Sequence, residues 1–164
     1  MKSLDKKEFI QEITLNVCSK INEVNFSIVD VDDSGGFDNL IVYLQSKLFN
    51  LRILQHRGEV DFEIGFNTKK KNEIKWLNLK QFFDYMNASS NYNVNINISE
   101  SDYNIIKKYE YQKYEIAKNS ILLKNNIESI ISFISKEKEE KIIDGMKKFI
   151  NNFEKTFFDS IAKK

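Results

Sequence analysis

Apolar positions in residues 4–23 recur at spacings of three and four, which is the period of an amphipathic helix. The period then changes to two between Val24 and Ile28, as in a strand. Residues 30–38 are rich in turn-forming side chains and predict a connection to the next strand. Residues 40–44 are apolar on both faces and predict a central strand that is covered on both sides.

Residues 48–66 predict a β-hairpin with Arg57-Gly58 as a two-residue loop. With that loop, Ile53 lies opposite Phe62 on an apolar face. The other predicted pairs are Leu51 with Ile64, Gln55 with Val60, Arg52 with Glu63, Leu54 with Asp61 and His56 with Glu59. A slip of one residue would place apolar side chains opposite acidic ones, so the pattern favours this register.

The next segments are a basic stretch, a short helix and an alternating stretch. Residues 67–75 predict a basic loop, and Trp76 leads into the helix. That helix has an apolar face that can cover the sheet, formed by Leu79, Phe82, Phe83 and Met86. Residues 91–98 alternate strictly between apolar side chains and asparagine, which predicts an edge strand or an extended connector.

From residue 101 the pattern is helical to the last residue. Ser99 begins a capping-box pattern, which marks a helix start. The first of these helices is predicted to reach at least Lys118 and then to continue to about 134 or to bend near 119–120 or 125–126. The last helix is predicted to cover roughly 136–162.

These elements predict an α+β fold, with a mostly antiparallel sheet of four or five strands flanked by helices. We expect residues 1–98 to form the sheet region and residues 99–164 to form a long C-terminal helical pair packed on it. The length of 164 residues suits one compact domain.

The overall charge is nearly balanced, with 25 basic and 24 acidic side chains. A dedicated binder of nucleic acid or of anionic membranes would usually carry a clear cationic excess, so we expect neither partner. The balance is a sum over two unlike regions. Residues 1–66 hold 7 basic and 11 acidic side chains, whereas residues 67–164 hold 18 and 13. An acidic sheet region can steer a basic protein partner.

The composition leaves little material for catalysis or metal binding. Cys18 is the only cysteine and His56 the only histidine, which argues against a disulfide framework, most metal cages and the usual nucleophile–base pairs. We therefore expect no cofactor, no metal and no enzymatic activity. The first residues are charged and no apolar run approaches the ~18–20 residues of a membrane span, so we expect a cytoplasmic protein.

The acidic stretch 30–38 allows three interpretations. Asp30, Asp32 and Ser34 fall near the first ligand positions of a calcium-binding EF-hand loop. The twelfth position would be Ile41, where that loop needs a glutamate. An ordinary acidic turn is therefore favoured over a calcium site, and an acidic loop that faces a partner is the third interpretation.

Three other features of the sequence also allow a functional and a structural interpretation. His56 lies at the hairpin tip, where a solvated pair with Glu59 is favoured over acid–base catalysis. Residues 69–71 are three lysines that could touch nucleic acid, although a solvated loop is favoured. Four tyrosines at helical spacing could stack on bases, although packing is favoured. They are Tyr103, Tyr109, Tyr111 and Tyr114.

The stretch 51–65 resembles small bacterial immunity-type proteins, which pair with polymorphic or contact-dependent toxins. The resemblance lies in an apolar strand, an Arg-Gly turn, an alternating acidic and apolar strand, and then a tryptophan with a short helix, here Trp76 to Met86. It covers about residues 45–90. It implies a protein that has no catalytic residues and that occludes a toxin.

The expected function is therefore that of a non-enzymatic immunity protein, which neutralises a cognate toxin by masking its active or substrate site. The expected contact residues are Asp30, Asp32, Asp33, Asp38, His56, Arg57 and Glu59. The alternative is a structural or regulatory interaction module of a mobile-element or defence system. Such a module would form a homodimer through its C-terminal helices.

Overall fold

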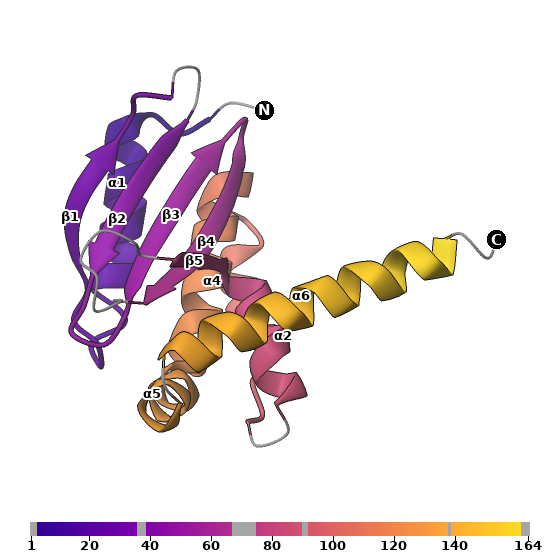
Figure 1. Cartoon of the computed structure of the whole chain (residues 1–164). Coiled ribbons are helices and arrows are strands. Elements are labelled where there is room, and N and C mark those ends of the chain that lie inside the picture. The colour runs from indigo at the N-terminus through magenta and orange to yellow at the C-terminus, as the bar shows by residue number, and fades with distance from the viewer. Residues whose placement is uncertain (1–2, 36–38, 67–74, 90–91, 138, 162–164) are drawn as a thin grey trace.

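A computed structural model describes residues 3–35, 39–66, 75–89, 92–137 and 139–161 and confirms the α+β fold (Figure 1). Its antiparallel sheet has the strand order β1-β2-β3-β4-β5. The strands are β1 (Ser27–Asp32), β2 (Leu40–Gln45), β3 (Asn50–His56), β4 (Glu59–Phe66) and β5 (Lys75–Asn78). The helices are α1 (Lys6–Ile13), α2 (Leu79–Ala88), α3 (Glu100–Ile106), α4 (Tyr111–Asn125), α5 (Ile127–Lys136) and α6 (Glu139–Ile161).

The hairpin formed by β3 and β4 has the predicted register at every pair, including Ile53 with Phe62 and His56 with Glu59. Arg57 and Gly58 both have positive φ angles, 50° and 86°. Two positive φ angles give a two-residue loop the twist that matches the flanking strands. The hydrophobic pattern and the turn residues therefore agree on the same register.

One face of the sheet, which we call the inner face, packs against α1 and α4, which lie behind the strands in Figure 1. Its buried apolar side chains are Leu40, Val42, Leu44, Leu51, Ile53, Val60, Phe62 and Ile64. Phe9 and Ile13 of α1 and Ile116 and Leu123 of α4 are fully buried on the helix side. Burial of this apolar surface provides most of the driving force for folding.

The remaining helices extend the core beyond the sheet. α2 buries Leu79, Phe82, Phe83 and Met86, as predicted. α6 packs closely against α2 at Gly145. The hydroxyl group of Tyr85 on α2 occupies the space that a side chain at position 145 would need, so only glycine fits there. The helix keeps contact with the body of the protein as far as Phe149 and Ile150. Its C-terminal part then projects away from the rest of the protein (Figure 1). Within the described ranges, no helix is both long enough and apolar enough to span a bilayer.

The N-terminal helix is shorter than predicted, and the first strand is shifted toward the C-terminus. Asp5 caps α1 in a capping box with Glu8, and a π-helical turn ends at Cys18 rather than at residue 23. β1 begins at Ser27 rather than at residue 24. Asn25 has a φ of 52°, which interrupts the extended backbone before the strand.

The fifth strand is not the one that the alternating pattern suggested. β5 begins at Lys75, which was predicted to end a basic loop, whereas residues 92–98 form the connector that was the other alternative. The side chain of Asn87 bonds both the backbone N–H and the carbonyl of Val94. Asn126 does the same for Asn95. These two amide side chains satisfy backbone N–H and carbonyl groups of the connector that a neighbouring strand would satisfy in a sheet.

The prediction of one helix from 101 to at least Lys118 is wrong. α3 ends at Ile106 and α4 begins at Tyr111, so the C-terminal region holds two helices where one was expected. The possible bend near 125–126 is confirmed, because Asn126 separates α4 from α5. Its buried side chain donates a hydrogen bond to the carbonyl of Leu122.

Candidate functional site

Five of the predicted contact residues within the described ranges lie at one end of the sheet, which we call the acidic end: Asp32, Asp33, His56, Arg57 and Glu59. Asp30 lies farther from this end, in the same row of the sheet as Tyr43 and Arg52. The interpretation of 30–38 as a loop is corrected, because β1 continues to Asp32 and pairs Asp30 with Tyr43 and Asp32 with Ile41. Asp38 lies outside the described residues.

Side-chain contacts join the separate parts of the acidic end. Nδ1 of His56 at the hairpin tip hydrogen-bonds to Oδ1 of Asn39, which precedes β2. Nζ of Lys6 on α1 lies 2.5 Å from Oδ2 of Asp33. The histidine stands opposite Glu59 in the register, as predicted, and the bond of its ring is with the asparagine. The turn after β1, the hairpin and α1 are thereby tied together.

Two carboxylates of the acidic end, those of Asp32 and Asp33, are stabilised in their ionised form. Hydrogen bonds from Ser34, including its backbone N–H at 2.8 Å, hold the pKa of Asp32 below the usual carboxyl value. The hydrogen bond and the positive charge of Lys6 lower the pKa of Asp33. Both side chains therefore carry a full negative charge at neutral pH.

The outer face of the sheet carries a stack of side chains that the sequence did not single out. The guanidinium carbon of Arg52 lies 5.0 Å from the ring centroid of Trp76, and Arg52 also forms an ion pair with Glu63. The ring of Tyr43 lies 6.0 Å from that of Trp76. Ile41 and Tyr43 are only half-buried, so the prediction that both faces of β2 are covered is wrong.

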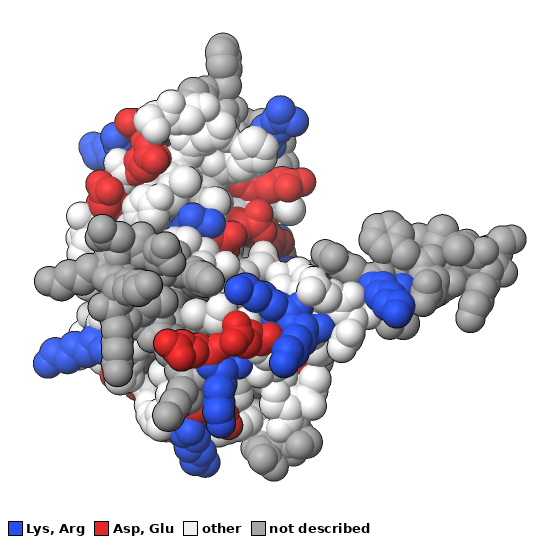
Figure 2. All heavy atoms as spheres, in the orientation of Figure 1, with Lys and Arg blue, Asp and Glu red and all other residues white. Residues whose placement is uncertain are grey.

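The outer face and the acidic end are continuous. Asp30 is paired with Tyr43, and Asp61 of β4 is paired with Leu54 on the same face. Figure 2 shows acidic side chains over both margins of the upper part of the sheet on this side of the molecule. Aromatic side chains supply much of the binding energy of protein interfaces, and charges of one sign at the rim steer a partner of the opposite charge.

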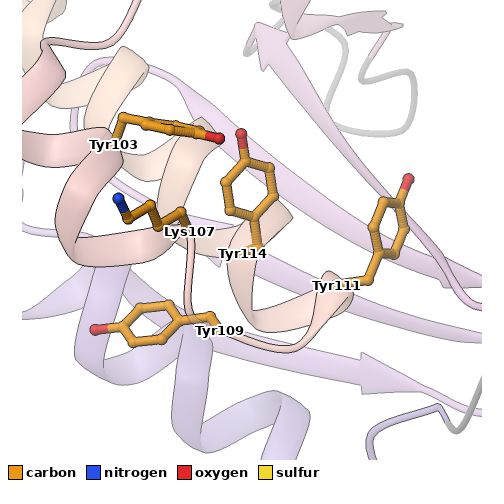
Figure 3. A pocket seen from close by; sticks show the side chains of 5 residues that line it. All are labelled: Tyr103, Lys107, Tyr109, Tyr111 and Tyr114. Carbon is orange, nitrogen blue, oxygen red and sulfur yellow. The ribbon is translucent and has the colours of Figure 1, made fainter.

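A second candidate site lies at the corner between α3 and α4, where an open hollow of about 360 Å³ is found. We call it the tyrosine hollow. Its lining residues are Tyr103, Lys107, Tyr109, Tyr111 and Tyr114 (Figure 3). The sequence favoured tyrosines that pack with their hydroxyl groups at the rim, and the structure leaves Tyr103, Tyr109 and Tyr111 46%, 39% and 44% exposed.

The tyrosine hollow follows from the interruption between α3 and α4. The chain leaves α3 after Ile106, whose side chain is buried, and Tyr109 lies in the connection. Tyr111 and Tyr114 follow at a spacing of three on α4, and side chains three apart lie on one side of a helix. The tyrosines were visible in the sequence, but their gathering depends on this interruption, which was not predicted.

Buried polar contacts connect the start of α4 with the acidic end of the sheet. Oε1 of Gln112 accepts a hydrogen bond of 2.6 Å from the backbone N–H of Leu4. Nε2 of Gln55, which precedes His56 in β3, donates to the carbonyl of Leu4 at 2.9 Å. The tyrosine hollow and the acidic end are therefore anchored to the same end of the sheet.

Other candidate chemistry lies apart from these surfaces. Cys18 is half-buried, and this burial raises the pKa of its thiol, which disfavours the reactive thiolate. Within the described ranges, no three His, Cys, Asp or Glu side chains lie close enough together to hold a metal ion. The lysines at 69–71 lie outside the described residues.

Searches of family models, of curated proteins and of solved structures found no match to this chain.

Proposed function

We propose that the protein is a non-enzymatic binding protein whose acidic end and outer sheet face cover a basic surface of a protein partner. Among proteins that work in this way, we favour an immunity protein that masks the active or substrate site of a cognate toxin. The observation that carries the proposal is the joining of two sheet loops by Asn39 and His56 beside the ionised Asp32 and Asp33.

The charges and the aromatic side chains would have different roles in such a contact. Acidic side chains at the rim of an interface accelerate association with a basic partner and select against acidic ones. Trp76 and Tyr43 provide the aromatic surface that dominates the binding energy of many interfaces. The sheet gives both groups a rigid support, because β2, β3, β4 and β5 pair without interruption in their registers.

The test compares two variants with the same change of charge. The first, Asp32→Lys/Asp33→Lys/Glu59→Lys, reverses the acidic end. The control, Glu128→Lys/Glu140→Lys/Asp144→Lys, reverses exposed acids on α5 and α6. Each chain is used to capture partners from cells of its source, and the captured protein is expressed with and without the chain in a growth assay.

We expect the wild type and the control to capture a basic protein that inhibits growth when expressed alone, and to relieve that inhibition. The acidic-end variant should bind about tenfold or more weakly, with a smaller dependence on salt. Equal capture by both variants would show that the contact surface is elsewhere. A captured protein that is harmless when expressed alone would contradict the immunity function.

The course of α6 favours a second candidate, a module that dimerises through its C-terminal helix. α6 leaves the body of the protein after its contact with α2 (Figure 1). The sequence repeats apolar residues along this part, at Phe153, Phe157 and Ile161. Light scattering of the full chain and of a chain that ends at Ile150 tests this function. A dimer that becomes a monomer on truncation supports it, and a full-length monomer contradicts it.

A further inference from the structure

The tyrosine hollow combines exposed aromatic faces with a fixed backbone. Ile106 and Ile116, on either side of it in the chain, are buried in the core. The ion pair of Lys113 with Glu12 adds a link between α4 and α1, with an N–O distance of 3.4 Å. Aromatic rings that are exposed on a rigid support bind ligands at a low entropic cost, because little has to be ordered on binding.

The polar groups of the hollow are all able to donate hydrogen bonds. They are the four phenol hydroxyls and the ammonium group of Lys107. Among the described residues, none of the four hydroxyls has a hydrogen-bond partner, and the lysine donates to Oδ1 of Asn104. In Figure 3 the hydroxyl ends of Tyr103 and Tyr114 point toward one another, and Lys107 lies between the rings of Tyr103 and Tyr109.

A ligand that fits this lining has flat apolar faces and hydrogen-bond acceptors that can take up the hydroxyl and ammonium protons. A proline-rich segment in the polyproline II conformation has these properties. Proline has no N–H, and its carbonyl groups have no partners within that helix. Its rings pack against aromatic side chains, which line the grooves of other domains that bind such segments.

We propose that the tyrosine hollow binds a proline-rich segment of a partner protein. No segment of these 164 residues is such a ligand, because they contain no proline. The site is separate from the acidic end, so the proposal stands whether or not the chain neutralises a toxin. The partner's prolines lie against the rings of Tyr103, Tyr109 and Tyr114, and their carbonyls accept hydrogen bonds from the hydroxyls.

The charge beside the hollow selects the residues that flank the prolines. Lys107 and Lys108 have no carboxylate partner among the described residues, whereas Lys113 and Lys118 are paired with Glu12 and Glu115. These two lysines, which have no carboxylate partner of their own in the described part of the chain, favour a carboxylate at one end of the bound segment. The preferred ligand is therefore a run of prolines followed by one or two acidic residues.

The test measures the binding of a labelled synthetic peptide of about ten residues, mostly proline and ending in two glutamates, by fluorescence polarisation with the full chain. A second peptide has glycine and serine in place of the prolines, and a third has glutamine in place of the glutamates. A short single-stranded oligonucleotide is the fourth probe, because exposed tyrosines also stack on bases. The proline–glutamate peptide is expected to bind at least tenfold more tightly than the glycine–serine peptide.

Variants locate the binding site. Tyr109→Ala, in the exposed connection, should weaken binding of the proline–glutamate peptide about tenfold. Tyr109→Phe keeps the ring and should weaken it about two- to fivefold, through loss of the hydroxyl. Lys107→Gln should remove the preference for glutamate over glutamine, which we expect to be about two- to fivefold. The variant with the reversed acidic end should bind this peptide as the wild type does.

Three outcomes would overturn the proposal. The first is equal binding of the proline–glutamate and glycine–serine peptides, or no detectable binding of either. The second is an unchanged affinity of Tyr109→Ala for the proline–glutamate peptide while the protein remains folded by circular dichroism. The third is tighter binding of the oligonucleotide than of the proline–glutamate peptide, which would assign the hollow to single-stranded nucleic acid. None of these outcomes bears on the acidic end, so the two proposals fail or succeed separately.

Discussion

The two faces of the sheet differ in what they contact, although the same strands form both. On the inner face, Ile53 is fully buried beneath α1 and α4, together with the side chains paired with it on β2 and β4. On the outer face, the neighbouring residue Leu54 is half-buried and stands opposite Asp61. Adjacent residues of one strand therefore have different physical roles.

The difference indicates that the inner face provides most of the stability of the sheet, whereas the outer face can accept substitutions that create a binding surface. A close-packed inner face tolerates few changes, because each lost methyl group leaves a cavity. The outer face combines charged and aromatic side chains whose interactions are mostly with one another, as in Arg52 with Trp76 and Glu63. The outer face can therefore change its chemistry at a small cost in stability.

The largest expected effect comes from comparing alanine substitutions at two neighbouring residues of β3, Ile53 and Leu54. Ile53→Ala removes a fully buried side chain from the inner face and should lower the free energy of unfolding by about 2–5 kcal/mol. Leu54→Ala, the matched change on the outer face, should lower it by about 1 kcal/mol or less. Denaturation in urea measures both values. Equal losses would mean that the two faces are equally packed, which would break the comparison.

The inner face and the hairpin were predictable from sequence for a physical reason. Alternation of apolar and charged residues in β3 and β4 leaves a single register that keeps acidic groups out of the core, and Gly58 allows the turn. The apolar face of α2 was also visible, because four residues at helical spacing must be covered together. Such local patterns of apolar and polar residues are sufficient to predict which side chains are buried.

The outer-face stack and the tyrosine hollow depend on contacts that local patterns do not contain. Trp76 meets Arg52 only because residues 75–78 form a strand, and that short segment has no clear alternation. The four tyrosines gather because the helix is interrupted after Ile106, where the sequence has neither proline nor glycine to signal a break. The contact between Asn39 and His56 likewise joins loops that are distant in the sequence.

A smaller effect is expected from the stack on the outer face. Arg52→Ala removes a partly exposed ion pair and a cation–π contact, and should lower the free energy of unfolding by about 1 kcal/mol. Emission from Trp76, the only tryptophan, should shift to longer wavelength as its ring becomes more hydrated. Arg52→Lys keeps the charge without the planar stack and should be intermediate. A loss as large as that of Ile53→Ala would show that the outer face also belongs to the core.

The smallest expected effect is a pH dependence of folding stability that arises from the ion pair of Lys6 with Asp33 at the acidic end. The pKa of Asp33 is lowered in the folded protein, so its stabilising contribution is complete above the unfolded carboxyl value of about 3.9. The contribution is lost as the pH falls through the lower value of the folded state. In Lys6→Ala the pKa of Asp33 should rise toward its usual value. Thermal unfolding should then show a small difference from the wild type at neutral pH that vanishes near pH 2.

Titration of the Asp33 carboxyl carbon by NMR measures this shift directly. Asp32 is the internal control, because Ser34 rather than Lys6 lowers its pKa, and its titration should be unchanged in the variant. High salt should weaken the shift, since both partners of the ion pair are exposed. An unchanged pKa of Asp33 in Lys6→Ala would show that α1 does not stabilise the charge at this end. The outer face and the acidic end would then be electrostatically independent of the helices that cover the inner face.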